Sequence, residues 1–367
     1  MVSIARKNLF HEWTRFLISM GGVAFSIFLM LYFLCVLNGF EFLLESFVNN
    51  QDADVWVIEQ GKIDFFRGTS FLPETLAFEI ESYGGVKGVD KLLTRTIRVG
   101  EDENISLIII GYNTRTGNGG PWNIVEGKSS VGPNEIIIDR AFAKKYGYSL
   151  YDLLDIKDEE FRIVGVNDYS SVLMWQYSFI TYEDFIRLFP DTLNMTNYLM
   201  VQLKHPEFAD SIKGTLESAF EVNAFTKPEF LVNNKQLIRE GFLPILYAIL
   251  LIGLLVGTAF VAVTIYTVTV ERIKEYGILK AIGASNPQLY SIIFQQSLIS
   301  SIIGYFVGCV FTFMSVFITY NYYPELTTIL RFESFIYMFF VSILISLVAS
   351  YIPIKKVSKV DPLMIFR

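Results

Sequence analysis

Charge is scarce in this sequence of 367 residues. Asp, Glu, Lys and Arg together make up 18% of it, whereas 52% of the residues are hydrophobic and the mean hydropathy is +0.41. A water-soluble protein of this length carries more charge. Four long segments, 16–40, 241–270, 287–320 and 334–354, contain no charged residue at all. Each exceeds the roughly 20 residues that a helix needs to cross a bilayer, so the sequence predicts four transmembrane helices.

Cysteine and histidine are also rare, and this limits the chemistry that the chain can perform. The two cysteines, Cys35 and Cys309, lie in apolar segments, so the long polar segment between the first two spans has no disulfide. The two histidines are His11 and His205, and the sequence contains neither His-Glu-x-x-His nor Cys-x-x-Cys. We therefore expect no metal site and no catalytic residues.

A complete ATP-binding loop is missing as well. Gly127, Lys128 and Ser129 match the end of the Gly-x4-Gly-Lys-Ser/Thr pattern, but Trp122 stands where the first glycine is required. We expect the chain to bind no cofactor and not to be an enzyme. The chain itself would not hydrolyse ATP.

Lysine and arginine flank the apolar segments unequally. They are frequent at both ends of the chain and in segment 271–286, whereas segment 321–333 contains only Arg331. Because short cytoplasmic loops carry the excess of basic residues, we expect both termini and 271–286 in the cytoplasm, 41–240 outside, and the chain in the inner (plasma) membrane. The flanking basic residues are Arg6, Lys7, Arg15, Arg272, Lys274, Lys280, Lys355, Lys356, Lys359 and Arg367.

The polar segment 41–240 is long enough to form a hydrophobic core of its own. Strand-like runs alternate in it with helix-like stretches, so we expect an α+β extracytoplasmic domain inserted between the first and second spans. The loop 117–121 (Gly-Asn-Gly-Gly-Pro) predicts that the domain has two lobes. We expect one of them to be a middle lobe that spans about residues 111–175. Residues 41–50 and 229–240 continue the neighbouring spans helically, and they form either a paired stalk or ordinary linkers.

Segment 271–286, between the second and third spans, has an unusual pattern. Charges of both signs alternate in it, and apolar residues recur at Ile273, Tyr276 and Leu279 before Gly283 ends the pattern. This spacing predicts a short amphipathic helix. Such a helix could dock into a groove on a cytoplasmic partner, or it could simply connect two spans.

Two of the spans contain glycines four residues apart. Gly253 and Gly257 lie in the second span, and Gly304 and Gly308 lie in the third. This spacing lets helices pack closely, either within one subunit or between two.

The segment from Glu271 to Ala284 resembles the signature of MacB/FtsX/LolE-type ABC transporter permeases. The C-terminal segment 352–367 is similar to the closing pattern of that family, with Ile354 and Val357 in place of two alanines. Segments 134–147 and 161–166 are similar to its external domain, and segments 21–25 and 52–57 resemble the DevC-like branch.

This resemblance implies a type VII, mechanotransmission permease with a 1+3 arrangement of helices. The first 15 residues then resemble an interfacial amphipathic helix on the cytoplasmic side, and residues 355–367 a cytoplasmic tail. Segment 271–286 corresponds to the coupling loop, which contacts the ATPase subunit. The residues implied in that contact are Glu271, Arg272, Lys274, Glu275, Tyr276, Gly277, Leu279, Lys280, Ala281, Gly283 and Ala284.

The resemblance also implies which partners the chain binds and what it transports. The chain would form a homo- or heterodimer, bind an ABC ATPase, and export or extract a lipid-like, lipoprotein or peptide substrate. A periplasmic adaptor and an outer-membrane channel are further partners where an outer membrane exists, and nucleic acid is not expected.

Two other functions stay open. One is an FtsX-like lever that regulates an external partner such as a cell-wall hydrolase, and the other is a membrane-tethered sensor without an ATPase. The coupling motif disfavours the sensor, and the size of segment 41–240 favours export over the lever.

Overall fold

The computed structural model describes residues 13–99, 105–172, 175–323 and 325–358. Most of the expected amphipathic helix at 1–15 and of the tail at 355–367 lies outside the described residues. The chain divides into two compact units. A membrane unit contains residues 1–38, 242–319 and 328–367, and an external unit contains residues 39–241 and 320–327. The chain therefore passes from one unit to the other four times.

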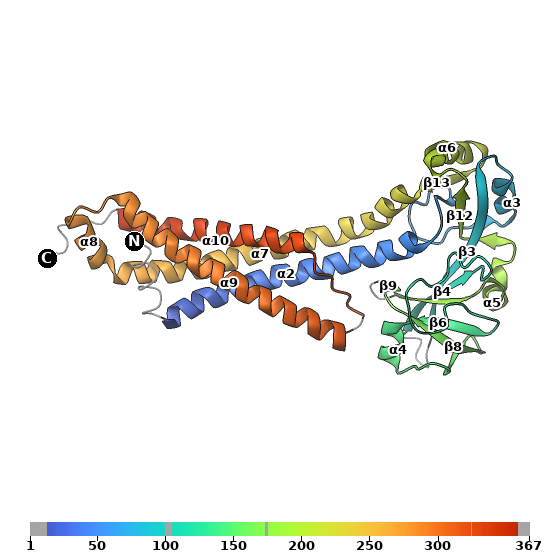
Figure 1. Cartoon of the computed structure of the whole chain (residues 1–367), viewed down its shortest axis with the longest axis horizontal. Helices are drawn as coiled ribbons and strands as arrows, with labels where there is room; N and C mark the ends of the chain where they lie inside the picture. Colours follow the sequence, from blue (N-terminus) through green and yellow to red (C-terminus); the bar gives the residue numbers. More distant parts are fainter. Residues whose placement is uncertain (1–12, 100–104, 173–174, 324, 359–367) are drawn as a thin grey trace. The chain divides into compact units, whose positions relative to one another are not determined.

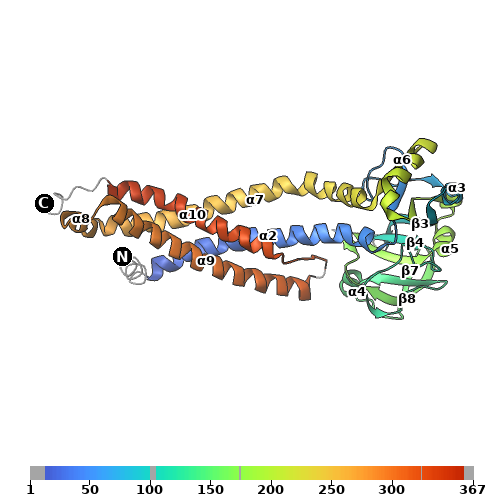
Figure 2. The ribbon, with the colours of Figure 1, turned by 45° about the horizontal axis from the view of Figure 1, so that its top comes forward.

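The membrane unit is built from four long helices. They are α2 (Trp13–Asn50), α7 (Lys227–Glu271), α9 (Asn286–Tyr322) and α10 (Phe332–Ser358), and they run beside one another in both views (Figures 1 and 2). Each is long and apolar enough to cross a membrane, which confirms the prediction of four spans. Helices α2 and α7 continue without a break into the external unit, so segments 41–50 and 229–240 are helical.

The bundle is closely packed because small residues lie where its helices meet. A Cβ atom added to Gly304 would lie 2.7 Å from Cβ of Val23, and one added to Gly253 would lie 2.8 Å from Cγ of Met30. Gly257 faces α2 and α10, and Gly308 faces α2. All four glycines of the two Gly-x3-Gly pairs thus lie at contacts within this chain, where a larger side chain would force the helices apart.

The external unit contains one large sheet flanked by four short helices. The strand order is β13-β1-β12-β3-β4-β10-β6-β8-β5, with β7 paired to β8, β9 paired to β10, and a separate pair β11-β2. The helices are α3 (Thr75–Glu81), α4 (Arg140–Tyr146), α5 (Tyr182–Leu188) and α6 (Ala209–Ala219). The strands are β1 (Val55–Glu59), β2 (Leu72–Pro73), β3 (Val86–Val99), β4 (Ile105–Tyr112), β5 (Ile124–Gly127), β6 (Glu135–Asp139), β7 (Leu153–Ile156), β8 (Glu159–Asn167), β9 (Ser171–Val172), β10 (Trp175–Thr181), β11 (Met195–Thr196), β12 (Tyr198–Leu203) and β13 (Val222–Thr226).

Two hydrophobic cores lie along this sheet. One is formed by β1, β12 and β13 with α3 and α6, and the other by β4, β6, β8 and β10 with α4 and α5 (Figure 1). The 14-residue strand β3 belongs to both, because its first half pairs with β12 and its second half pairs with β4. The two lobes therefore share one continuous sheet.

Candidate functional site

The first candidate site is the turn between α7 and α9, which forms the short helix α8 (Ile273–Ala281). Helix α8 ends in a Schellman motif, in which Gly283 N–H donates to the Lys280 carbonyl and Ala284 N–H donates to the Leu279 carbonyl, at 3.0 and 2.9 Å. Gly283 has a φ of +98°, which favours glycine at this position. The sequence thus sets the end of the helix.

One face of α8 is buried in the helical bundle. Tyr276 is 3% exposed and packs in a cluster with Ile293 and Val357, and Gly277 is buried beside it. Lys280 Nζ donates a hydrogen bond of 3.0 Å to the Ser358 carbonyl at the end of α10. The bundle therefore holds α8 in one orientation.

The opposite face of α8 is exposed. Lys274, Glu275, Ile278, Ala281 and Ile282 follow the helical period of three to four residues, and all five are exposed. Ile278 is 50% exposed and Ile282 is 76% exposed. Two large aliphatic side chains beside charged ones form a surface that a protein partner could cover.

The residues expected to contact an ATPase do not all lie on the exposed face of α8. It brings Lys274, Glu275 and Ala281 onto the exposed face, whereas Tyr276 and Gly277 face the bundle. Glu271 and Gly283 are exposed at the two ends of α8. Arg272 lies at the junction with α7, where its Nη1 is 3.4 Å from Glu275 Oε2, and Leu279, Lys280 and Ala284 are half-buried.

The sequence reasoning missed Ile278 and Ile282. The signal for Ile278 was its position three residues after Glu275 and four after Lys274, and the signal for Ile282 was its position four residues after Ile278. Sequence alone could not separate them from Ile273 and Leu279, because the apolar residues of this segment lie on both sides of the helix.

A second candidate site is the point where the two long helices enter the external unit. Phe47, near the end of α2, packs on Trp56 of β1 with ring centroids 6.2 Å apart. Phe230, in the first turns of α7, stacks on the same Trp56 at 5.0 Å. All three side chains are at most 2% exposed. One indole therefore anchors both helices to the sheet.

The start of α7 also provides a hydrogen-bond donor for the backbone carbonyls at the end of α2. Lys227 Nζ donates to the carbonyls of Asn49 and Gln51 at 3.0 and 2.7 Å. A cation at the C-terminal end of a helix interacts favourably with the helix dipole. Burial lowers the pKa of Lys227, while the nearby Asp52 and Asp54 act in the opposite direction. Further along, Lys235 of α7 forms an ion pair with Glu45 of α2.

The glycine-rich loop 117–121 holds the end of α2 from the other side. The Gln51 side chain accepts a hydrogen bond from Gly119 N–H and donates one to the Gly120 carbonyl. Asn118 exchanges two 2.9 Å hydrogen bonds with the backbone of Asp52, and its amide also donates to Asp90 on β3. This loop therefore fastens the helix–strand corner to the middle of the sheet.

Two family models match the sequence. The MacB-like periplasmic core domain matches residues 16–219, which is more than half of the chain, and the FtsX-like permease C-terminal model matches residues 247–362. The second match contains α8, and the first contains both the Trp56 anchor and the loop that supports it.

Individual relatives agree with these matches. An uncharacterized ABC transporter permease of Mycobacterium tuberculosis is 23% identical over 348 residues, 94% of this chain and 93% of the relative. Another, from Methanocaldococcus jannaschii, is 23% identical over 228 residues, 59% of this chain and 57% of the relative.

Two solved structures are similar to about half of this chain. The periplasmic region of MacB from Actinobacillus actinomycetemcomitans covers 52% of this chain and 95% of its own, with 13% identity and a TM-score of 0.37. The extracellular domain of YknZ, an ABC-type transporter from Gram-positive bacteria, covers 47% of this chain and 100% of its own, with 13% identity and a TM-score of 0.36. The two family models, which match residues 16–219 and 247–362, show that the chain belongs to the MacB- and FtsX-like family of ABC transporter permeases.

Proposed function

We propose that this chain is the permease subunit of an ABC transporter in the plasma membrane, and that its α8 helix docks onto a separate ATPase subunit. Both termini and α8 would lie in the cytoplasm. The observation that carries the proposal is the exposed face of α8, in which Glu275, Ile278 and Ile282 lie together on a helix whose opposite face is held by the bundle.

The chain would pass the movement of the ATPase to its external unit. Helices α2 and α7 support this idea, because each is continuous from its membrane span into the external unit. A continuous helix transmits a displacement along its axis better than a flexible linker does. Trp56 would receive that displacement because it contacts both helices, and Lys227, the first residue of α7, would link α7 to the end of α2. We infer a dimer of permease subunits and a lipid-like, lipoprotein or peptide substrate that is exported or extracted.

The docking face can be tested by co-expression with candidate ABC ATPase subunits of the same cell, followed by purification in detergent. The variant Ile278→Asp places a charge in the centre of the exposed face and should abolish co-purification. The matched control is Gln288→Glu in α9, which adds the same charge at a nearby exposed site and keeps the hydrogen bond that Gln288 accepts from Ser285 N–H.

The wild type and Gln288→Glu should retain the ATPase equally. Retention of the ATPase by Ile278→Asp, in a sample that elutes as a folded protein, would exclude α8 as the docking element. Retention of no candidate by the wild type would favour the sensor without an ATPase.

A further inference from the structure

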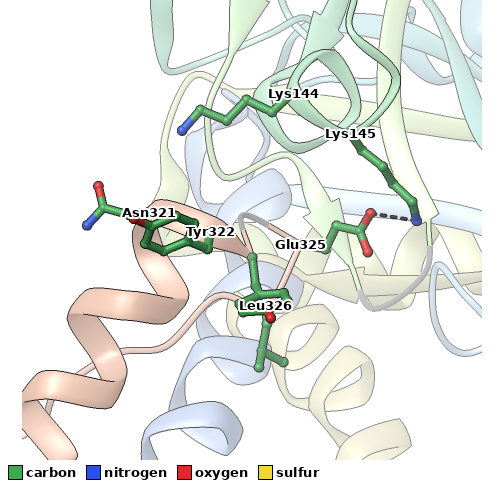
Figure 3. Close-up of a pocket in the computed structure, with 7 residues that line it drawn as sticks. Lys144, Lys145, Asn321, Tyr322, Glu325 and Leu326 are labelled. Atoms are coloured by element: carbon green, nitrogen blue, oxygen red, sulfur yellow. Dashed lines mark ion pairs between the residues drawn. The ribbon is translucent and has the colours of Figure 1, made fainter.

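A cavity of about 590 Å³ lies within the external unit, at the end of α9. Its walls come from two distant parts of the sequence: the last turn of α4, and the chain that leaves α9. Figure 3 shows these side chains around the opening. The lining residues are Lys144, Lys145, Asn321, Tyr322, Tyr323, Glu325 and Leu326.

The cavity lies at the end of a membrane span. Helix α9 is one of the four helices long and apolar enough to cross a membrane, and its last residues, Asn321 and Tyr322, line the cavity. Tyr320, Tyr322 and Tyr323 follow one another there with exposed fractions of 51–76%. Tyrosines gather in this way at membrane–water interfaces, where their rings face the lipid and their hydroxyl groups face water.

The walls of the cavity are held together by polar contacts. Lys145 Nζ lies 2.6 Å from Glu325 Oε1. Next to the cavity, Arg140 donates a hydrogen bond of 3.1 Å to the Tyr320 hydroxyl, and its guanidinium lies 5.2 Å from the centre of that ring. Arg140 is itself paired with Asp168 at 2.9 Å. The cavity is therefore preformed, and a ligand need not order its walls.

One positive charge in the cavity is not neutralised. Lys145 and Glu325 neutralise each other, and the exposed side chain of Lys144 forms no ion pair or hydrogen bond with any other described residue. In Figure 3 the Lys144 amine and the Asn321 amide lie on one side of the opening, with the Tyr322 ring next to them and Leu326 beyond that ring. A single anionic group with an apolar neighbour complements this arrangement.

We propose that this cavity binds the phosphate group of a phospholipid from the outer leaflet, with the phosphate at Lys144 and the glycerol region against Tyr322 and Leu326. The proposal goes beyond the transport function and does not depend on an ATPase. A free phosphate ion has the same chemistry as the headgroup and is distinguished from it by the test.

The test uses the full chain in a nonionic detergent, titrated with dioleoyl phosphatidylglycerol and followed by native mass spectrometry. Dioleoylglycerol has the same acyl chains without the phosphate and serves as the comparison ligand. Lys144→Gln removes the unpaired charge and should weaken phosphatidylglycerol binding by about tenfold, the effect of losing one charge-assisted hydrogen bond. Lys87→Gln, at an exposed lysine on β3, is the matched control and should bind as the wild type does.

Glu325→Gln provides the opposite change. It releases Lys145 and raises the charge of the cavity from +1 to +2, so phosphatidylglycerol should bind more tightly to this variant than to the wild type. A variant that only damaged the fold would not gain affinity.

Three results would overturn the proposal. The first is equal binding of phosphatidylglycerol by the wild type and Lys144→Gln. The second is binding of dioleoylglycerol as tight as that of phosphatidylglycerol. The third is displacement of the lipid by millimolar inorganic phosphate, because the cavity would then be a site for the free ion.

Discussion

Asp139 shows how a single buried carboxylate organises the lobe that carries Lys144. It is 1% exposed and caps α4 by accepting a 2.7 Å hydrogen bond from Ala141 N–H. It also accepts hydrogen bonds from the backbone and the hydroxyl group of Ser170, at 3.1 and 2.7 Å. Burial raises the pKa of Asp139 to about 6, although these hydrogen bonds act in the opposite direction.

This pKa gives a pH dependence with a definite sign. The folded state holds the proton up to about pH 6, whereas an unfolded Asp loses it near 3.8, so the stability that this group contributes falls as the pH rises between these values. The change is at most about 3 kcal/mol. Hydrogen–deuterium exchange of the α4 amides, corrected for intrinsic rates, should show faster opening at pH 7 than at pH 4. Asp139→Asn, which does not titrate, should remove this slope, and an unchanged slope in that variant would assign it to another group.

For single residues, the sequence indicated which local structure each residue type favours, but it did not indicate which residues would pack against one another. Gly283 as the end of a helix followed from its residue type, because glycine adopts a positive φ at little cost. The burial of Tyr276 did not follow, because tyrosine suits both a protein interior and an interface. Only the packing of α8 on α9 and α10 determines which side of it is accessible.

Single helices and strands differ in how well the sequence predicts them. The spans were predictable because a charge within the bilayer is costly, and this leaves a signal in every residue of the run. Strand β3 is harder to predict than the spans, because its residues are buried in no simple alternation, with Leu92 and Leu93 both at 0% exposure. The glycine-rich loop was predicted as a loop, but its contact with the end of α2 depends on residues far away in the sequence.

The contact between α2 and α9 gives a prediction about helix packing. Gly304→Leu places a side chain where Val23 already lies, so it should lower the stability of the bundle by about 1–3 kcal/mol, the usual cost of overpacking. Gly21→Leu is the matched control, because a Cβ atom at Gly21 meets nothing within 4 Å. Thermal unfolding in detergent should show a lower midpoint for Gly304→Leu alone. Equal midpoints for the two variants would mean that this helix contact does not support the bundle.

We propose that the two continuous helices, α2 and α7, pass movement from the ATPase to the external unit. Cross-linking the two helices to each other tests this proposal. Glu45 on α2 and Lys235 on α7 are ion-paired, so cysteines at these two positions can be linked by a short thiol-reactive cross-linker. The native Cys35 and Cys309 are buried and should react slowly. If transport requires movement between the helices, the cross-link should reduce ATP turnover of the assembled transporter about tenfold or more, a barrier increase of about 1.4 kcal/mol.

A cross-link within one helix is the control for this experiment. Glu45→Cys combined with Asn49→Cys places both thiols on α2, four residues apart, and leaves α7 free. ATP turnover should be unaffected by linking this pair. Full turnover of the Glu45–Lys235 cross-linked protein would show that the two helices move as one body during the cycle.

Strand β3 has a consequence for how far the external domain can move its outer edge. A hinge between the two lobes would have to bend β3 at Leu92, where its pairing passes from β12 to β4 and where the side chains of Leu92 and Leu93 are fully buried. The sheet should therefore respond as a stiff plate, with Trp56 near one edge and β5 at the other. In a stiff plate, a small tilt at the anchored edge becomes a larger excursion at the far edge, so the domain would gain reach at the expense of force. If α2 and α7 drive the domain as proposed, small strokes of these helices would suffice under such leverage. A substrate that must be pulled hard would then be held close to the anchor.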